Sequence, residues 1–148
     1  MAYRTVVQRG DPTIDEAMAG GTIKPGHLVE FYNASGTKKL RVHATAGGNA
    51  SPIFALEDEL QGKDMADSYS SGQQCRVGTF KAADLVAAWI YANETIAIAT
   101  KLESKGDGTL RAVVADAPSA NTAENWVAQA EEALSGNTVD TLCLCRIV

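Results

Sequence analysis

The stretch TLCLCRIV at residues 141–148 is the clearest strand pattern in the chain. Leu142, Leu144 and Ile147 stand among two thiols and one charged side chain. Residues two positions apart on a strand point to the same face of its sheet, so we expect Cys143 and Cys145 to lie side by side. The stretch therefore predicts a strand.

The same kind of pattern extends through most of the chain. From Ile23 onward, turn residues recur about every ten residues, and the segments between them are short and rich in Val, Ile, Leu, Tyr and Thr. This spacing predicts a mainly β fold, a compact antiparallel β-barrel or sandwich. Residues 33–36 are typical of a hairpin turn. The expected strands cover residues 27–32, 38–44, 52–56, 76–80, 85–91, 95–99 and 109–115.

The N-terminal part of the chain is expected to be different. Residues 1–12 mix a few apolar side chains with polar ones and end in a turn-forming Gly-Asp-Pro, which predicts an extended arm ahead of a single β-rich domain at residues 13–148. Thr13 and Glu16 fit a capping box, and Gly20-Gly21 would end a helix after about two turns. We therefore expect one short helix directly after the arm.

Composition limits the classes of function. A chain of 148 residues with 45% hydrophobic residues is long and apolar enough for one folded domain. The formal net charge is −5 and both signs are interspersed, so we expect no nucleic-acid partner. There is no secretory signal pattern, and no apolar run approaches the roughly 20 residues that span a bilayer, so we expect no membrane partner and a cytoplasmic site of synthesis.

The cysteines and histidines do not form a metal-binding motif. Cys75, Cys143 and Cys145 are odd in number and include no CxxC pair, while His27 and His43 stand alone. In a reducing compartment, cysteine behaves as a small hydrophobic residue. We therefore expect three buried free thiols, no metal and no cofactor.

Candidate catalytic motifs are incomplete. Residues 62–69 loosely resemble the acidic-tyrosine segment of trimeric dUTP pyrophosphatases, but Ser68 separates the aspartate from Tyr69, and Ser70-Ser71 lacks a preceding arginine. The GxSxG elbow that exposes a nucleophilic serine is absent. The acidic residues of the long polar segment 57–74 lack the spacing of a calcium loop. We therefore expect no enzymatic activity.

Residues 44–72, ATAGGNASPIFALEDELQGKDMADSYSSG, resemble a segment of small bacteriophage capsid decoration (cement) proteins. In that family a Gly-rich turn, an Ala-Leu-Glu strand end and a Gly-Lys loop with a tyrosine follow in this order. Shorter stretches that resemble the same family lie at residues 2–12, 20–29, 102–110 and 146–148, so the resemblance spans nearly the whole chain.

Two segments depart from the family pattern. The turn KAAD at residues 81–84 stands in place of a Pro-Gly-Asp type turn. Residues 127–133, VAQAEEA, stand where relatives carry a strand reading Ala-Leu-Glu-Ala. The composition of this second segment favours a helix, but the resemblance implies a strand at residues 126–133, and we adopt the strand because tertiary context can override propensity.

The resemblance implies a structural role on the outside of a virion. Decoration proteins of this kind bind the outer surface of an assembled head and bridge neighbouring major capsid protein subunits, often as dimers or trimers. A protein that binds only the matured lattice stabilises it by mass action, without catalysis. The alternative is a small β-barrel module that binds carbohydrate. Such sites favour exposed aromatic side chains in a groove, and the chain offers only Trp126, a few tyrosines and Trp89, which its apolar strand places in the core.

The arm and the long loop are the candidate capsid-binding segments. An extended arm can add to a strand edge of a partner, and long loops on a rigid scaffold commonly carry function. The alternative for the arm residues is that they cover their own barrel, and for Tyr69 that it packs within the loop. The predicted contact residues are Tyr3, Val6, Val7, Arg9, Met65 and Tyr69.

Overall fold

The computed structural model describes residues 3–114 and 125–148. In this part of the chain there are eleven strands and one 3₁₀ turn, η1 (Glu59–Gln61), so the predicted mainly β fold is confirmed. The strands are β1 (Val7–Arg9), β2 (Thr13–Ala19), β3 (Val29–Ala34), β4 (Thr37–Val42), β5 (Ile53–Ala55), β6 (Gln74–Thr79), β7 (Leu85–Ile90), β8 (Lys101–Ser104), β9 (Leu110–Ala112), β10 (Trp126–Ala130) and β11 (Thr141–Ile147). No helix among the described residues is long and apolar enough to cross a membrane.

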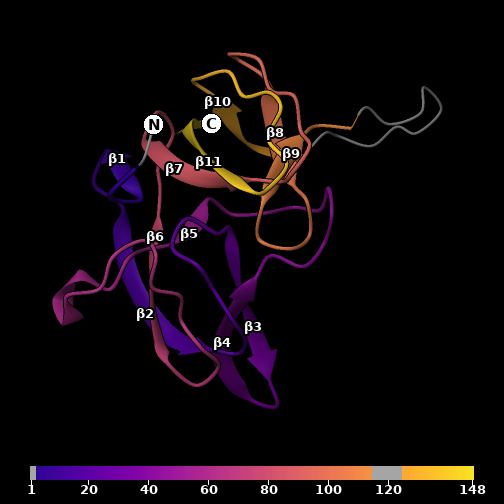
Figure 1. The fold of residues 1–148 in the computed structure, drawn as a ribbon. Helices are drawn as coiled ribbons and strands as arrows, with labels where there is room; N and C mark the ends of the chain where they lie inside the picture. The colour runs from indigo at the N-terminus through magenta and orange to yellow at the C-terminus, as the bar shows by residue number, and fades with distance from the viewer. Residues whose placement is uncertain (1–2, 115–124) are drawn as a thin grey trace.

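Five strands close into a barrel, which forms the upper half of Figure 1. Their order is β7-β11-β10-β8-β9, and a parallel pairing of Ile90 with Leu110 joins β9 back to β7. The strand β11 pairs antiparallel with both β7 and β10. Its residues Cys143, Cys145 and Ile147 are buried, so the alternating pattern of this stretch places one apolar face inward.

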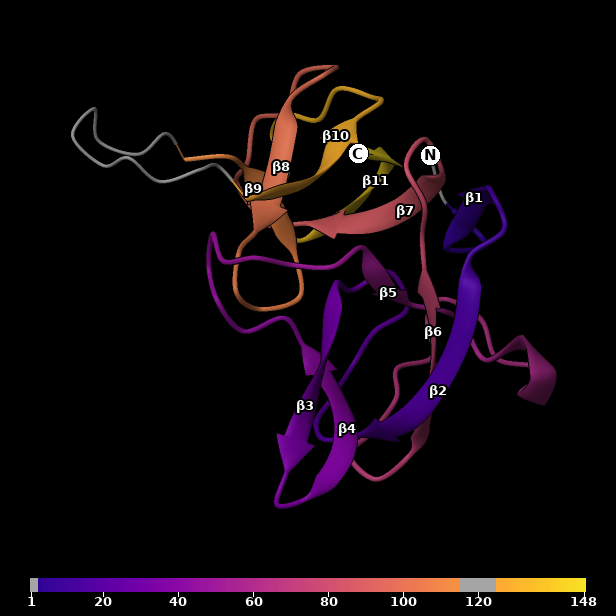
Figure 2. The same cartoon turned by 180° about the vertical axis from the view of Figure 1, so that it is seen from behind.

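The strand β1 pairs with β7 at the barrel, and the remaining five strands form a second sheet, in the order β3-β4-β2-β6-β5, below the barrel in Figures 1 and 2. The predicted hairpin is confirmed, with Ala34 paired to Thr37 across a two-residue turn. Between β2 and β4 the pairing is parallel; apart from this pair and β7–β9, all named strand pairs are antiparallel, as predicted. A bridge between Leu28 and Phe54 brings the outer strands of this sheet together at one end.

The buried apolar side chains form two clusters. The larger one fills the barrel and also takes in Leu28, Phe54 and Met65 from the sheet and the long loop. The rings of Phe54 and Phe80 meet edge to face with their centroids 5.8 Å apart. The smaller cluster lies within the five-stranded sheet and includes Leu40 and Val77. Barrel and sheet therefore share part of one core.

The predicted short helix after the arm is wrong, because residues 13–19 form the strand β2. This strand lies inside the sheet, where six of its residues pair with β6 and two with β4. Ala17 and Ala19 are buried while Met18 between them is exposed, which is the period of a strand. A helix of two turns has little stability of its own, so pairing on both edges outweighs the local capping signal.

Of two further expected strands, one is present and the other is not. The strand expected from the resemblance at residues 126–133 is confirmed over Trp126–Ala130. The strand expected at residues 95–99 is wrong: Ile96 makes a single bridge to Leu134, and Ala99 has a left-handed φ of 73°. The strand β8 was not predicted. All three cysteines are free and buried, as expected.

Candidate functional site

The described part of the arm lies along the barrel, beside β7 in Figure 1. The backbone N–H of Ala87 donates to the carbonyl oxygen of Val6 at 2.9 Å. The hydroxyl of Tyr3 donates to Glu132 Oε1 at 2.5 Å, and the same oxygen accepts the N–H of Leu144 at 2.8 Å. Strand pairing and a side-chain hydrogen bond therefore both hold the arm on the barrel.

Glu57 joins the arm to the start of the long loop. Its carboxylate accepts hydrogen bonds from the hydroxyl of Thr5 and from the backbone N–H of Val6, the latter at 3.1 Å. Glu57 is only 9% exposed, so these donors replace water that burial removes. Nothing in the sequence distinguishes Glu57 from its acidic neighbours, because both of its partners lie about fifty residues away in the chain.

Two shallow hollows beside the arm share Met65 and Ala66 in their linings. The first, of about 340 Å³, is also lined by Tyr3, Arg4 and Asp64. The second, of about 270 Å³, is also lined by Lys24, Trp89 and Leu142. We call these eight residues the Met65 surface. Met65 itself is 8% exposed, whereas Ala66 is exposed, so Ala66 presents the outermost part of the shared lining.

The Met65 surface brings together two of the predicted contact residues, Tyr3 and Met65, from segments about sixty positions apart. Arg9 is exposed on β1, outside this surface. Val7 is half-buried and lines a different hollow of about 290 Å³ with Thr5 and Pro12.

Two predicted contact residues are part of the chain's own core. Val6 is fully buried in the barrel cluster. Tyr69 is 4% exposed, donates its hydroxyl to the Leu56 carbonyl at 2.7 Å, and pairs with Ile23 through the backbone. For these two side chains the structure agrees with the alternative of internal packing.

The Met65 surface has an apolar centre and charges of both signs around it. Lys24 Nζ lies 5.3 Å from the centre of the Trp89 ring, and the indole N–H of Trp89 donates to the Pro25 carbonyl at 2.8 Å. These contacts fix the orientation of Trp89. Arg4 and Asp64 lie at the other hollow. An apolar centre with a charged rim is typical of a surface that contacts another protein.

Groups that could carry chemistry elsewhere are buried. The imidazole of His43 bonds Ser104 Oγ at 2.7 Å, but Ser104 is fully buried and out of reach of a substrate. Burial raises the pKa of Cys75 to about 12, which keeps this thiol protonated and weakly nucleophilic at neutral pH. Within residues 3–114 and 125–148, no group of His, Cys, Asp or Glu side chains is arranged to hold a metal ion.

Comparison with known proteins identifies a shared fold. No model of a protein family and no curated protein matches the chain. Among solved structures, the crystal structure of the N base of the head fiber gp8.5 of bacteriophage phi29 matches with a TM-score of 0.60 and 14% sequence identity. The match covers 93% of this chain and 95% of that chain. The chain therefore has the fold of this head fiber base along nearly its whole length.

Proposed function

We propose that this chain is a head-associated structural protein of a bacteriophage, which binds the outer surface of the capsid and stabilises it by bridging neighbouring capsid subunits. The observation that carries the proposal is the fold match to a head fiber base over 93% of the chain. The resemblance of residues 44–72 and of several shorter stretches to head decoration proteins supports the same role.

The Met65 surface is the proposed contact with the capsid. It combines the arm and the long loop, the two segments expected to bind. The Tyr3 bond to Glu132 holds the arm on the barrel, and the buried bond from Val6 to Glu57 holds the loop on the arm. A contact region that is ordered before binding loses less conformational entropy when it binds. Several copies bound to one lattice would then stabilise it by mass action, and no catalysis is required.

The alternative of a carbohydrate-binding module has less support. Stacking of a sugar requires an open aromatic face. Each of the five half-exposed rings outside the arm has a lysine or arginine within 4.0 to 5.3 Å of its centre. These pairs are Lys38–Phe31, Arg41–Tyr32, Lys24–Trp89, Lys105–Tyr91 and Lys101–Trp126. A cation therefore lies on one face of each of these rings, which reduces the aromatic surface that is open to a sugar.

Cosedimentation with capsids tests the proposal. The purified protein is mixed with heads of its own phage that lack it, before and after expansion, and the bound fraction is measured against concentration. We expect saturable binding to expanded heads. Ala66→Glu places a charge in both hollows without touching the core and should weaken binding about tenfold or more.

The matched control is Ile98→Glu, which introduces the same charge at a side chain that is 67% exposed and lies outside the Met65 surface. This variant should bind like the wild type. Absence of binding to any head would reject the role on the capsid. Equal weakening by both variants would reject the Met65 surface as the contact and leave only a general effect of charge.

A further inference from the structure

The strand β3 has an open edge. It is the last strand of the five-stranded sheet and pairs only with β4. Near its start the bridge between Leu28 and Phe54 covers this edge, but beyond Leu28 no described residue pairs with it. An uncovered strand edge is a template for pairing with another chain.

The hairpin geometry shows which backbone groups face the open edge. The turn residues Ser35 and Gly36 both have positive φ, 54° and 90°, as in the two-residue hairpin turn whose flanking residues form a hydrogen-bonded pair. Here that pair is Ala34 and Thr37. The carbonyl of Leu40 accepts the N–H of Gly20 at 2.8 Å, so the backbone of Leu40 points away from β3. Its partner Phe31 therefore points its own N–H and C=O to the open side, as does Asn33 two residues on.

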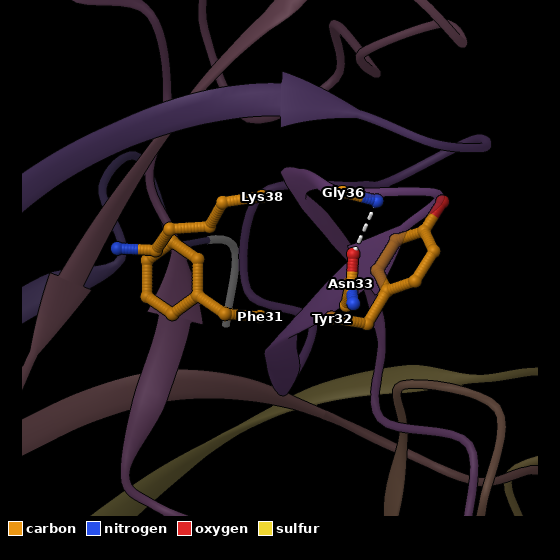
Figure 3. Close-up of a pocket in the computed structure, with 5 residues that line it drawn as sticks. All are labelled: Phe31, Tyr32, Asn33, Gly36 and Lys38. Atoms are coloured by element: carbon orange, nitrogen blue, oxygen red, sulfur yellow. Dashed lines mark hydrogen bonds between the residues drawn. The ribbon is translucent and has the colours of Figure 1, made fainter.

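A shallow hollow of about 440 Å³ lies at these residues (Figure 3). It is lined by Phe31, Tyr32, Asn33, Gly36 and Lys38. The ring of Phe31 is half-buried, with Lys38 Nζ 4.0 Å from its centre. The hollow offers an apolar side chain of an added strand a place to pack, next to backbone groups that can bond it.

The charge of the hairpin indicates which partner fits. Lys38, Lys39 and Arg41 stand against the single acid Glu30 within residues 29–42, while the whole chain has a net charge of −5. Arg41 is paired with Glu30 at 2.8 Å, and Lys38 lies 3.8 Å from Asp15. Among the described residues Lys39 has no acidic partner. This positive region repels a second copy of itself and attracts an acidic segment.

We propose that the open edge of β3 accepts an extended acidic segment of a partner protein, which adds a sixth strand to this sheet. Side chains alternate along such a strand, so its apolar residues would lie on the face of Phe31 and its acidic residues on the opposite face, which carries Lys39 and Arg41 on β4, one strand further in. The inference does not depend on the proposed function, because the edge lies outside the Met65 surface.

Titration with synthetic peptides, followed by NMR of the ¹⁵N-labelled protein, tests this inference. The probe is a capped peptide of alternating aspartate and valine, and the control probe alternates lysine and valine. We expect saturable shifts at the amides of Phe31 and Asn33, and at least about tenfold weaker binding of the lysine peptide. Shifts elsewhere, or equal binding of both peptides, would overturn the proposal.

A pair of variants at Asn33 isolates the backbone contribution. Asn33→Pro removes an N–H that faces the open edge, so the pairing with β4 keeps its own bonds. Asn33→Ala keeps this N–H, and both variants lose the side-chain bond to the Gly36 N–H. We expect the proline variant alone to lose peptide binding. Concentration-dependent dimerisation through the same amides would instead show a second copy at the edge and reject the acidic partner.

Discussion

Ala83 has a backbone conformation that suits glycine better than alanine. Its φ is 76°, in a turn closed by hydrogen bonds between Lys81 and Asp84. The resemblance to decoration proteins places a Pro-Gly-Asp type turn at this position. Ala83→Gly should therefore raise the free energy of unfolding by about 0.5–1 kcal/mol, measured by urea denaturation. Ala82→Gly, at a neighbour without a positive φ, should lower it; a loss in both variants would contradict the prediction.

His27 makes stability depend on pH. Burial, helped by the nearby Lys24, lowers the pKa of this imidazole from 6.5 to about 4, and its Nδ1 accepts the backbone N–H of Lys24 at 3.2 Å. Below pH 6.5 the unfolded chain binds a proton that the native state does not bind until about pH 4. The stabilisation is therefore complete above pH 6.5 and is lost as the pH falls toward 4.

We expect His27→Asn, which keeps an acceptor near the Lys24 N–H, to weaken this pH dependence. The difference in unfolding free energy between about pH 7.5 and about pH 4.5 should be smaller in the variant by about 2 kcal/mol. Urea denaturation of both proteins at the two pH values measures it. The two proteins differ only at residue 27, so an unchanged difference would mean that His27 does not contribute.

At the scale of residues, the sequence predicted which side chains are apolar better than it predicted what those side chains contact. The three buried thiols followed from their apolar context. Val6 and Tyr69 were predicted as capsid contacts, with internal packing as the alternative, and both side chains pack within this chain. No local pattern tells whether a side chain packs on its own chain or on a partner, and Glu57 was missed for the same reason.

At the scale of elements, strands with a strong internal pattern were predicted and those defined by their neighbours were not. The hairpin β3–β4 and the strands β7 and β11 have β-branched or aromatic residues and turn signals of their own. By contrast, β2 has a capping pattern that favours a helix and becomes a strand because β4 and β6 pair with its two edges. The pairing of β2 with β6 joins segments about sixty residues apart, so the pattern of residues within β2 does not indicate it.

The arm element makes a prediction about stability. Val6 is fully buried, and Ala87 donates its N–H to the Val6 carbonyl. Val6→Ala removes two buried methyl groups and should lower the unfolding free energy by about 2 kcal/mol. Deletion of residues 1–4 leaves Val6 and β1 in place and removes the Tyr3 bond to Glu132, at a cost of about 1 kcal/mol.

Urea denaturation followed by tryptophan fluorescence measures both variants, since Trp89 and Trp126 lie on barrel strands. A folded deletion variant is the one to use in capsid binding, because any loss then reflects the contact rather than unfolding. If Val6→Ala has no effect on stability, the arm at Val6 is not part of the cooperative core.

At the scale of the whole molecule, barrel and sheet should unfold together. Phe54 belongs to the sheet through β5, yet it is fully buried in the cluster that fills the barrel, where it meets Phe80. Alternate N–H groups along β7 and just beyond its end also donate to other parts of the chain: Ala87 to the arm, Trp89 to residue 26 and Tyr91 to Leu110. Hydrogen bonds along this edge of β7 therefore connect three parts of the chain: the arm, the segment before β3, and β9, which closes the barrel.

Phe54→Ala tests this coupling, because it leaves a cavity where the two halves meet and should cost about 3–5 kcal/mol. Native-state hydrogen exchange follows Val77 in the sheet and Cys143 in the barrel. If both halves form one cooperative unit, the protection of both amides falls by the same free energy, and the milder Phe54→Leu lowers both by a smaller equal amount. A loss confined to Val77 would mean that the barrel folds without the sheet, and that only the sheet depends on the shared core.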